Sequence, residues 1–338
     1  MQKRCFFRKI KQADFAGIIG VDDVCRCFSS IFLTTNDEIK NNEDLYSMRL
    51  TIATRKSNLA LWQAKAVQQL LKDYYPEATV DLLPMVSEGD RLLESSLATL
   101  GGKGLFIRAL EKMLLEGKAD MAVHSLKDMP AVIDERFQLA AFLPREDPSD
   151  AWISKEPTPF ALTKGIVGTS SLRRKALLLK HTPHLRVEIV RGNVETRLNK
   201  LDTGAFDALL LACAGLKRLN LAERITMPLP TKDFIPAPGQ GIIAIEILSN
   251  RLDLREILKP LDDESARLCA LTERAVAAYL GLDCSAPFGA YAKLDGENLL
   301  LHAFIATMDG SGMRDVSLQG PSHEPLALAK RCAMALIS

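Results

Sequence analysis

The stretch LTIATRKSNLALWQAKAVQQLL, residues 50–71, shows the pattern that decides the fold of this chain. Its first five residues combine apolar and β-branched side chains, which is typical of a short strand. The polar residues 55–57 follow, and after them Leu59, Trp62 and Ala66 recur at the spacing of one helix face. A strand, a polar loop and an amphipathic helix in this order predict one repeat of an α/β fold.

Further apolar segments end in polar, mostly basic loops. These are MAVHS before Lys127 and Asp128, GIVGT before residues 170–174, VEIV before residues 191–193, and DALLLACAG before residues 216–218. Strands that alternate with helices predict a parallel sheet whose loops gather at the carboxyl ends of the strands. Open α/β sheets bind ligands at that edge, where helix N-termini also present free N–H groups. We therefore expect the binding site in these loops.

Two Pro-rich stretches, residues 143–148 and 235–241, interrupt this pattern and are typical of crossings between lobes. If one lobe is inserted into another, residues 48–143 with 242–259 form a first domain, and residues 149–235 form a second. The second crossing then returns the chain to the first lobe after a complete α/β block.

The C-terminal residues 264–338 are predicted to form a small α+β domain. Its elements are a helix over residues 264–280, strands over 288–294 and 299–308, a hairpin turn over 309–312, and a helix over 326–336. At the other end, residues 1–47 contain an apolar patch that is too short and too acidic for a membrane span or a signal sequence. We expect a poorly ordered or dispensable extension there, or a start codon placed too early, with the folded part of the chain beginning near Met48.

The composition excludes several classes of function. The chain has 338 residues, of which 47% are hydrophobic and 25% charged, as is ordinary for a soluble globular protein. Its 43 basic and 42 acidic residues nearly cancel, so no overall field favours an anionic membrane or nucleic acid, and an RNA-binding module is disfavoured. Seven cysteines at irregular spacing argue against a disulfide framework or a zinc site, and for a reducing compartment.

The predicted ligand edge is rich in cations. Its loops contain Arg55, Ser57, Lys103, Lys127, Arg173, Arg174 and Arg191, and one acid, Asp128. For a single arginine, a solvated ion pair is the ordinary interpretation. Arg173 and Arg174, however, follow two serines suited to an N-cap, and a cation in a first helical turn opposes the helix dipole unless an anion binds. The set predicts a ligand with several carboxylates or phosphates, held by guanidinium forks.

Asp128 is the exception at this edge. Positive neighbours would keep its carboxylate ionised in a partly dry cleft. Such a carboxylate could stabilise a cation that develops on a substrate and that the arginines would oppose. A structural role in the turn before Pro130 can hold at the same time.

The Gly-rich stretch at residues 101–104 has a lysine, Lys103, just before a predicted helix. It lacks the length and the trailing Ser or Thr of a P-loop, so a nucleotide site is a weak interpretation. A mobile lid, formed together with the polar residues 87–99, fits better.

The cysteines divide into two kinds. Cys213, Cys269 and Cys332 lie in apolar or helical runs and are expected to be buried packing residues. Cys284 lies in a Pro-containing loop, where packing explains a cysteine less easily, so it is a candidate nucleophile or attachment point. The neighbouring Asp283 would disfavour a thiolate, and by spacing alone an ordinary loop cysteine remains the alternative.

A series of long motifs resembles one known family. The motifs are, in order, IATRKSNLALWQA, GGKGLF, AVHSLKDMP, REDPSDAW, VGTSSLRR, RGNVETRL, LACAGLKRL, PAPGQG and the loop around Cys284. From Arg49 to about Gly310 the chain resembles porphobilinogen deaminase, also called hydroxymethylbilane synthase, of tetrapyrrole biosynthesis.

The resemblance implies an α/β fold with two lobes built like those of periplasmic binding proteins, each around a mixed sheet, and a small α+β C-terminal domain. It implies that Cys284 carries a dipyrromethane cofactor through a thioether. Four porphobilinogen molecules would add with loss of ammonia, and hydrolysis would release 1-hydroxymethylbilane on the way to haem or chlorophyll. It further implies a cytoplasmic monomer that uses no metal and binds neither nucleic acid nor a membrane.

The resemblance also implies roles for individual residues. Asp128 matches the catalytic aspartate that stabilises cationic intermediates. The residues that would hold the cofactor are Cys284, Lys127, Ser171, Arg173, Arg174 and Arg191. The residues that would hold the carboxylates of the substrate are Arg55, Ser57, Lys103, Arg191 and Arg197. The alternative from another class is a two-lobed protein that captures a polyanion without chemistry, which predicts no covalent adduct and no need for Asp128.

Overall fold

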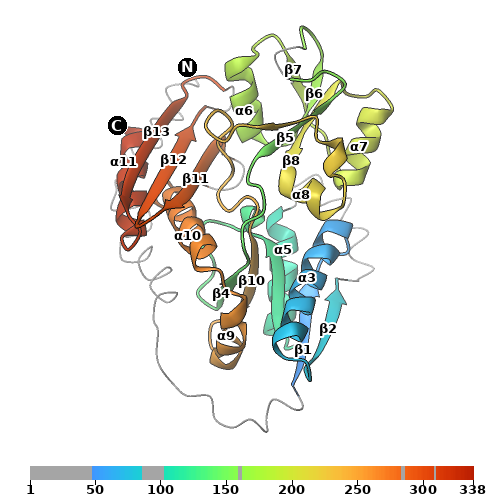
Figure 1. Cartoon of the computed structure of the whole chain (residues 1–338), viewed down its shortest axis with the longest axis vertical. Coiled ribbons are helices and arrows are strands. Elements are labelled where there is room, and N and C mark those ends of the chain that lie inside the picture. Colours follow the sequence, from blue (N-terminus) through green and yellow to red (C-terminus); the bar gives the residue numbers. More distant parts are fainter. Residues whose placement is uncertain (1–47, 86–102, 159–161, 283–285, 308–309) are drawn as a thin grey trace. The chain divides into compact units, whose positions relative to one another are not determined.

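The computed structural model shows a chain that divides into two compact units (Figure 1). The residues that the structure describes are 48–85, 103–158, 162–282, 286–307 and 310–338. Among these residues, the Asp128 unit comprises 48–144 and 242–267, and the Asp150 unit comprises 145–241 and 268–338. The chain changes unit within the first Pro-rich stretch, directly after the second, and again between residues 267 and 268. The domain boundaries expected from the sequence stay a prediction.

A five-stranded sheet in the order β2-β1-β3-β10-β4 forms the centre of the Asp128 unit. Its strands are β1 (Arg49–Thr54), β2 (Thr79–Pro84), β3 (Met121–Ser125), β4 (Phe137–Phe142) and β10 (Ile243–Leu248). Strands β1, β2 and β3 are parallel, whereas β10 is antiparallel to both β3 and β4. The helices are α3 (Asn58–Tyr74), α5 (Lys103–Leu115), α9 (Leu252–Leu258) and the 3-10 turns η2 (Leu126–Asp128) and η5 (Lys259–Leu261).

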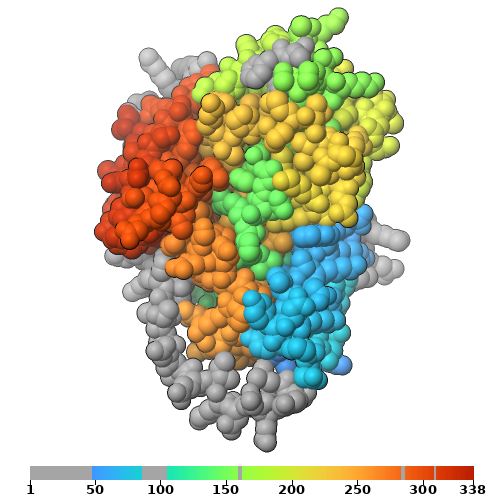
Figure 2. Space-filling model, in the orientation of Figure 1, coloured from blue at the N-terminus to red at the C-terminus, as the bar shows by residue number. Residues whose placement is uncertain are grey.

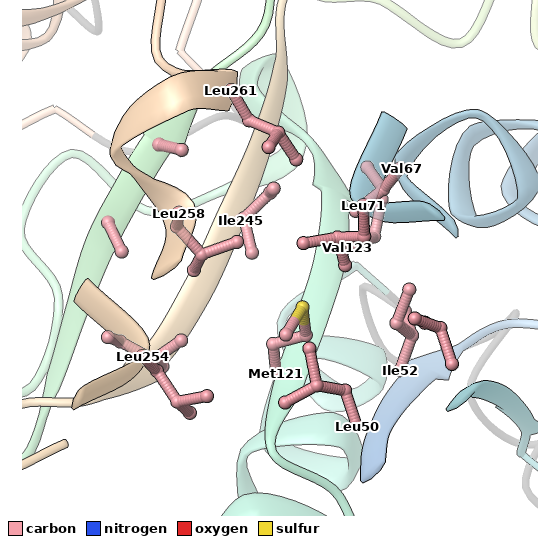
Figure 3. Packing of buried hydrophobic residues seen from close by; sticks show 14 of the residues in the cluster. Leu50, Ile52, Val67, Leu71, Met121, Val123, Ile245, Leu254, Leu258 and Leu261 are labelled. Carbon is pink, nitrogen blue, oxygen red and sulfur yellow. The ribbon is translucent and has the colours of Figure 1, made fainter. Parts of the chain in front are cut away.

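Helix α3 packs on one face of this sheet. Its residues Val67 and Leu71 are fully buried and meet the apolar side chains of alternate strand residues (Figure 3). The strand residues in this cluster include Ile52, Val123 and Ile245. Because successive residues of a strand point to opposite faces, their neighbours along the strands face the other side.

Helix α5 covers that other face. Leu110 and Leu114 of α5 are buried in a second cluster with Ala53, Ala122 and Phe137 from the strands. The sheet is therefore enclosed by helices on both sides, and its strands are apolar on both faces, as expected for a buried α/β sheet.

The Asp150 unit has a second five-stranded sheet, in the order β7-β6-β8-β5-β9. Its strands are β5 (Asp150–Ser154), β6 (Ile166–Gly168), β7 (Arg186–Glu188), β8 (Ala208–Ala212) and β9 (Met227–Leu229). Its helices are α6 (Leu172–His181), α7 (Val194–Asp202), α8 (Cys213–Arg218) and the 3-10 turn η4 (Ala222–Arg224). Strand β6 is parallel to β7 and β8, whereas β5 is antiparallel to β8 and β9.

A three-stranded antiparallel sheet ends the same unit. The sheet consists of β11 (Phe288–Asp295), β12 (Asn298–Ile305) and β13 (Arg314–Pro321). The accompanying helices are α11 (Pro325–Ile337) and α10 (Glu264–Tyr279), which belongs to this unit from residue 268 onward. Figure 2 shows this sheet and α11 as one continuous orange-red surface. Strand β13 is not marked in the sequence analysis, because its exposed, polar alternation RDVSLQ is a weak strand signal. The small α+β part itself is confirmed.

Mixed sheets correct the parallel sheet that the alternation of strands and helices predicts. Strands β5 and β10 are the antiparallel members, and each follows a change of unit rather than a helix of its own unit. A parallel neighbour needs a crossover connection, usually a helix, and these two strands have none before them. The mixed sheets implied by the family resemblance are confirmed.

Within the described part of the chain, none of the helices is both long enough and apolar enough to cross a bilayer.

Candidate active site

A pocket of about 90 Å³ opens at the carboxyl ends of β1 and β3 in the Asp128 unit. Helix α5 forms an apolar wall with Phe106, Ile107 and Leu110. The polar residues that line the pocket are Arg55, Ser57, Gln63, His124, Ser125 and Asp128. The structure thus brings together three residues that the sequence assigned to a site, one of them the lone acid.

Asp128 is presented by a tight turn after β3. Leu126, Lys127 and Asp128 form the turn, and the N–H of Met129 donates to the Leu126 carbonyl at 3.0 Å. Leu126 and Met129 are buried, whereas Lys127 and Asp128 between them are only half-buried. Because the two apolar side chains anchor the turn, the carboxylate of Asp128 can face the pocket without carrying the packing of the strand end.

Arg55 and Ser57 come from the loop between β1 and α3. The guanidinium carbon of Arg55 lies 4.1 Å from the centroid of the Phe106 ring, a cation–π contact. Ser57 is the N-cap of α3, and its Oγ accepts from the N–H of Ala60 at 3.4 Å. The helix cap explains the presence of Ser57. The same residue also lines the pocket with Arg55, whose guanidinium can bind a carboxylate.

Gln63 links α3 to the end of β3. Its Nε2 donates to Oγ of Ser125 at 2.8 Å, and the side chain is almost fully buried. Neither residue is predicted as part of a site from the sequence, because a glutamine on a helix face is ordinarily solvated. The bond holds together the two elements that frame the pocket.

His124 and Glu246 form a buried pair next to the pocket. His124 lies on β3 and Glu246 on β10, and Nε2 of the imidazole is 3.0 Å from Oε2 of the carboxylate. The two side chains are 5% and 0% exposed. This pair is not among the residues predicted from the sequence, although one acid in the apolar strand IAIEIL is a signal that the acid has a partner.

Asp150 holds both arginines at the start of α6 in the Asp150 unit. Arg173 binds the two carboxylate oxygens through Nη1 and Nη2 at 2.8 and 2.9 Å, and Nε of Arg174 donates to Oδ1 at 2.9 Å. Burial alone would raise the pKa of Asp150, but the two guanidiniums hold that pKa below its usual range. The chain itself therefore supplies an anion that the sequence analysis assigned to a ligand.

The other nitrogens of these arginines are partly used. Arg173 also donates to the carbonyl of Ile235 at 2.7 Å, and Arg174 donates to the carbonyl of Leu210 at 3.0 Å. Gln240 donates to Oδ1 of the same carboxylate at 2.9 Å. Among the described residues, Nε of Arg173 is buried without a hydrogen-bond partner. One donor thus remains for an anion that the chain does not provide.

The remaining predicted residues lie at helix starts. Ser171 caps α6, accepting from the N–H of Arg174 at 3.4 Å. Arg191 is exposed in the loop before α7, and Arg197, half-buried in α7, donates through Nε to the carbonyl of Gly192 at 2.8 Å. Lys103 begins α5. These positions are compatible with anion binding at helix N-termini, and the assignments of single residues stay predictions.

The three cysteines expected to be packing residues are buried. Burial raises the pKa of the Cys213 and Cys332 thiols to about 12, so neither forms a thiolate at neutral pH, and Cys269 is buried on α10. Cys284 and Asp283 lie outside the described residues, as does the predicted lid over residues 87–99. Of the His, Cys, Asp and Glu side chains that the structure describes, no three are grouped to hold a metal ion.

Comparison with known proteins gives two family matches. The model described as "Porphobilinogen deaminase, dipyromethane cofactor binding domain" matches residues 50–256. The model described as "Porphobilinogen deaminase, C-terminal domain" matches residues 267–338. Together they cover most of the chain, including both units.

Curated relatives agree with these matches. The porphobilinogen deaminase of Bordetella parapertussis is 47% identical over 292 residues, covering 86% of this chain and 93% of that protein. The porphobilinogen deaminase of Chromobacterium violaceum is 47% identical over 291 residues, covering 86% of this chain and 94% of that protein.

Solved structures that match this chain include two binding proteins. One is the probable amino-acid ABC transporter extracellular-binding protein ytmK from Bacillus subtilis, with 13% identity, a TM-score of 0.39, and coverage of 70% of this chain and 98% of that one. Another is a TRAP periplasmic solute binding protein from Desulfovibrio salexigens, with 15% identity, a TM-score of 0.39, and coverage of 69% and 77%.

Proposed function

Since this chain belongs to the porphobilinogen deaminase family, we propose that it is a transferase that condenses four porphobilinogen molecules, with loss of ammonia, into 1-hydroxymethylbilane. The product is built on a covalent dipyrromethane and is released by hydrolysis, for tetrapyrrole biosynthesis. The observation that carries the proposal is the pocket in which the Asp128 carboxylate lies with the guanidinium of Arg55.

Asp128 has the chemistry that the reaction needs. Loss of ammonia from porphobilinogen leaves an electron-poor methylene on the pyrrole, and positive charge develops on the ring. A carboxylate fixed in a small pocket with an apolar wall stabilises that charge more strongly than water does, and it can accept the pyrrole N–H. We assign this role to Asp128.

The basic side chains have a different role, which is to bind the carboxylates of the substrate. Each porphobilinogen carries an acetate and a propionate group, so a substrate presents two carboxylates. We propose that Arg55 and Ser57 in the pocket bind them, together with Lys103, Arg191 and Arg197.

The residues of the Asp150 unit fit a dipyrromethane by charge. Two linked pyrroles carry four carboxylates, and this unit offers the unpaired buried Nε of Arg173 and the exposed Arg191. When bound, the cofactor supplies a nucleophilic pyrrole carbon for the first condensation. We propose that the residues holding it are Cys284, through a thioether, with Lys127, Ser171, Arg173, Arg174 and Arg191. Asp150 orients both guanidiniums, and Nε of Arg173 is left for the ligand.

We further propose that the protein acts as a cytoplasmic monomer without a metal, a nucleic acid or a membrane as partner. The nearly balanced charge and the irregular cysteines support this setting.

Intact-protein mass spectrometry with peptide mapping tests the function. We expect a mass excess of two linked pyrrole units on Cys284, no excess in Cys284→Ala, and an unchanged excess in the matched control Cys213→Ala. A bare chain that gains this mass on incubation with porphobilinogen would also support the proposal. A chain that stays bare and leaves porphobilinogen unconsumed would refute it, and would favour a protein that binds a polyanion without chemistry.

A further inference from the structure

The pair of His124 and Glu246 is unusual among the charged groups of the Asp128 unit. Glu246 stands opposite Ala122 in the register of β10 and β3, so it lies on the sheet face that α5 covers, as does His124. Both side chains are almost completely buried, at 3.0 Å from each other. A charge this deep in an apolar face is costly, and one hydrogen bond offsets the cost only in part.

The carboxylate of Glu246 is only half satisfied. Its Oε1 is buried and has no hydrogen-bond partner among the described residues, and the apolar side chains on that face include Leu110, Leu114 and Ala122. At such a position a well-packed apolar residue stabilises a fold at least as well as an ion pair. The stability of the fold therefore does not explain why an acid is present at this position. A functional role of its partner, the imidazole of His124, explains it.

His124 connects this acid to the pocket. It lines the same pocket as Asp128 and Arg55. An ionised carboxylate only accepts, so Nε2 carries the hydrogen that Glu246 binds, and Nδ1 is left for the pocket. A carboxylate that sets the tautomer of an imidazole and stabilises its protonated form is the arrangement of a general base.

The other charged groups around His124 come from four elements. They are Glu246 on β10, Asp128 on η2, Arg55 after β1, and Glu111 on α5. Burial raises the pKa of Glu111, and the nearby Glu246 raises it further. Of these groups, Glu246 is the one within hydrogen-bond distance of the imidazole.

We propose that His124, oriented by Glu246, is the base that accepts the proton lost from a pyrrole ring when a carbon–carbon bond forms, an inference that rests on the function proposed above. The new bond joins the α-carbon of one ring to the methylene carbon that ammonia has left. The C–H bond at that α-carbon then breaks, its electron pair restores the aromatic ring, and the proton passes to Nδ1 of His124. Ammonia from the preceding step, or water, takes the proton from the imidazolium.

The variants His124→Gln and Glu246→Gln test this role in the full chain. His302→Gln is the matched control, because His302 is a half-buried imidazole 3.8 Å from Asp315 in the C-terminal sheet. We expect His124→Gln to lower kcat about 100-fold or more, with KM for porphobilinogen nearly unchanged, since a general base contributes on that order. Glu246→Gln should lower kcat by a smaller factor, and the control should leave it as in the wild type.

Two kinetic readouts separate a base from a residue that only packs. With porphobilinogen deuterated at its free α-carbon, His124→Gln should show a larger isotope effect than the wild type, because C–H cleavage becomes the slow step. The acidic limb of the wild-type pH profile of kcat should be absent in His124→Gln. An isotope effect and a pH profile that match those of the wild type would overturn the role.

A readout in the wild-type protein does not depend on the variants folding. Nitrogen-15 NMR of labelled histidine should show a protonated Nε2 in His124 and an Nδ1 signal that moves with pH and on addition of porphobilinogen. If porphobilinogen is consumed but the Nδ1 signal responds neither to pH nor to porphobilinogen, the role of His124 as the base is refuted and the proposed function is not. If porphobilinogen is not consumed at all, both the proposed function and the role of His124 are refuted.

Discussion

Asp128 lies in a turn whose packing is carried by its neighbours, so its charge can be removed without removing a core contact. Leu126 and Met129 are buried on either side of it, and Asp128 itself lines the pocket. A change at this residue should therefore act on the chemistry and not on the fold.

We expect Asp128→Asn to reduce turnover of porphobilinogen by at least about 100-fold, since it removes the charge that stabilises the cationic ring. The thermal midpoint and the covalent cofactor should be retained. The matched control is Asp134→Asn, which removes a surface acid paired with Arg136 in the same unit and should leave turnover unchanged. Steady-state assays measure turnover, and intact-protein mass spectrometry measures the covalent cofactor. Turnover near the wild-type level in Asp128→Asn would refute the catalytic role of Asp128.

At the scale of elements, the return from the Asp150 unit depends on Gly241. Its φ is +91°, and a Cβ on it would lie 2.2 Å from the carbonyl oxygen of Glu146. Its own carbonyl accepts from the N–H of Glu146 at 3.1 Å and from Arg218 at 2.6 Å. Both the left-handed backbone conformation and the close approach of the two chain segments around Glu146 and Gly241 require glycine here.

Gly241→Ala should therefore lower the free energy of unfolding by at least about 3 kcal/mol, because a backbone clash adds to the conformational strain. Gly204→Ala is the matched control: its φ is +78°, but a Cβ there meets nothing within 4 Å, so about 1 kcal/mol is expected. Urea unfolding of the three proteins measures the difference. Equal losses in the two variants would show that the close approach is not constraining.

At the scale of the whole molecule, two buried carboxylates tie distant parts of the Asp150 unit together. Asp150 on β5 binds the arginines at the start of α6, which in turn reach the carbonyls of Ile235 and Leu210. Glu273 on α10 accepts two bonds from Arg145 at 2.8 and 2.9 Å, and also the N–H groups of Gly239 and Ala292 at 2.7 Å. Each acid joins segments that are far apart in the sequence.

Asp150→Asn should lower the free energy of unfolding at pH 7 by about 3–5 kcal/mol, because two buried guanidiniums lose their anion. The control Asp202→Asn removes a half-exposed ion pair with Arg224 and should cost less than about 1 kcal/mol. Because the pKa of Asp150 is lowered in the folded chain, its contribution is complete above the ordinary carboxyl pKa and is lost as the pH falls below it.

The difference in the free energy of unfolding between the wild type and Asp150→Asn should accordingly decrease by about 1 kcal/mol between pH 7 and about pH 3. Urea titrations at the two pH values measure it. A gap of constant size would mean that the carboxyl of Asp150 has the same pKa in the folded and unfolded chain.

The sequence by itself determined the local elements and three residues of one unit's pocket. Strand β3 and its turn, the cap of α3 and the basic helix starts all follow from short-range patterns, as do the motifs that reveal the family. Arg55, Ser57 and Asp128 could be expected at one edge because parallel strands end together.

Only the tertiary structure decided the direction of β5 and β10 and the partners of the buried charges. His124 pairs with a residue 122 positions away, and Arg173 with one 23 positions away, so neither pairing leaves a periodic trace in the sequence. The residues next to Asp150 and Glu246 in the sequence predict only that each acid lies in a strand. Their cost in an apolar interior is offset by partners that only the folded chain brings within hydrogen-bond distance.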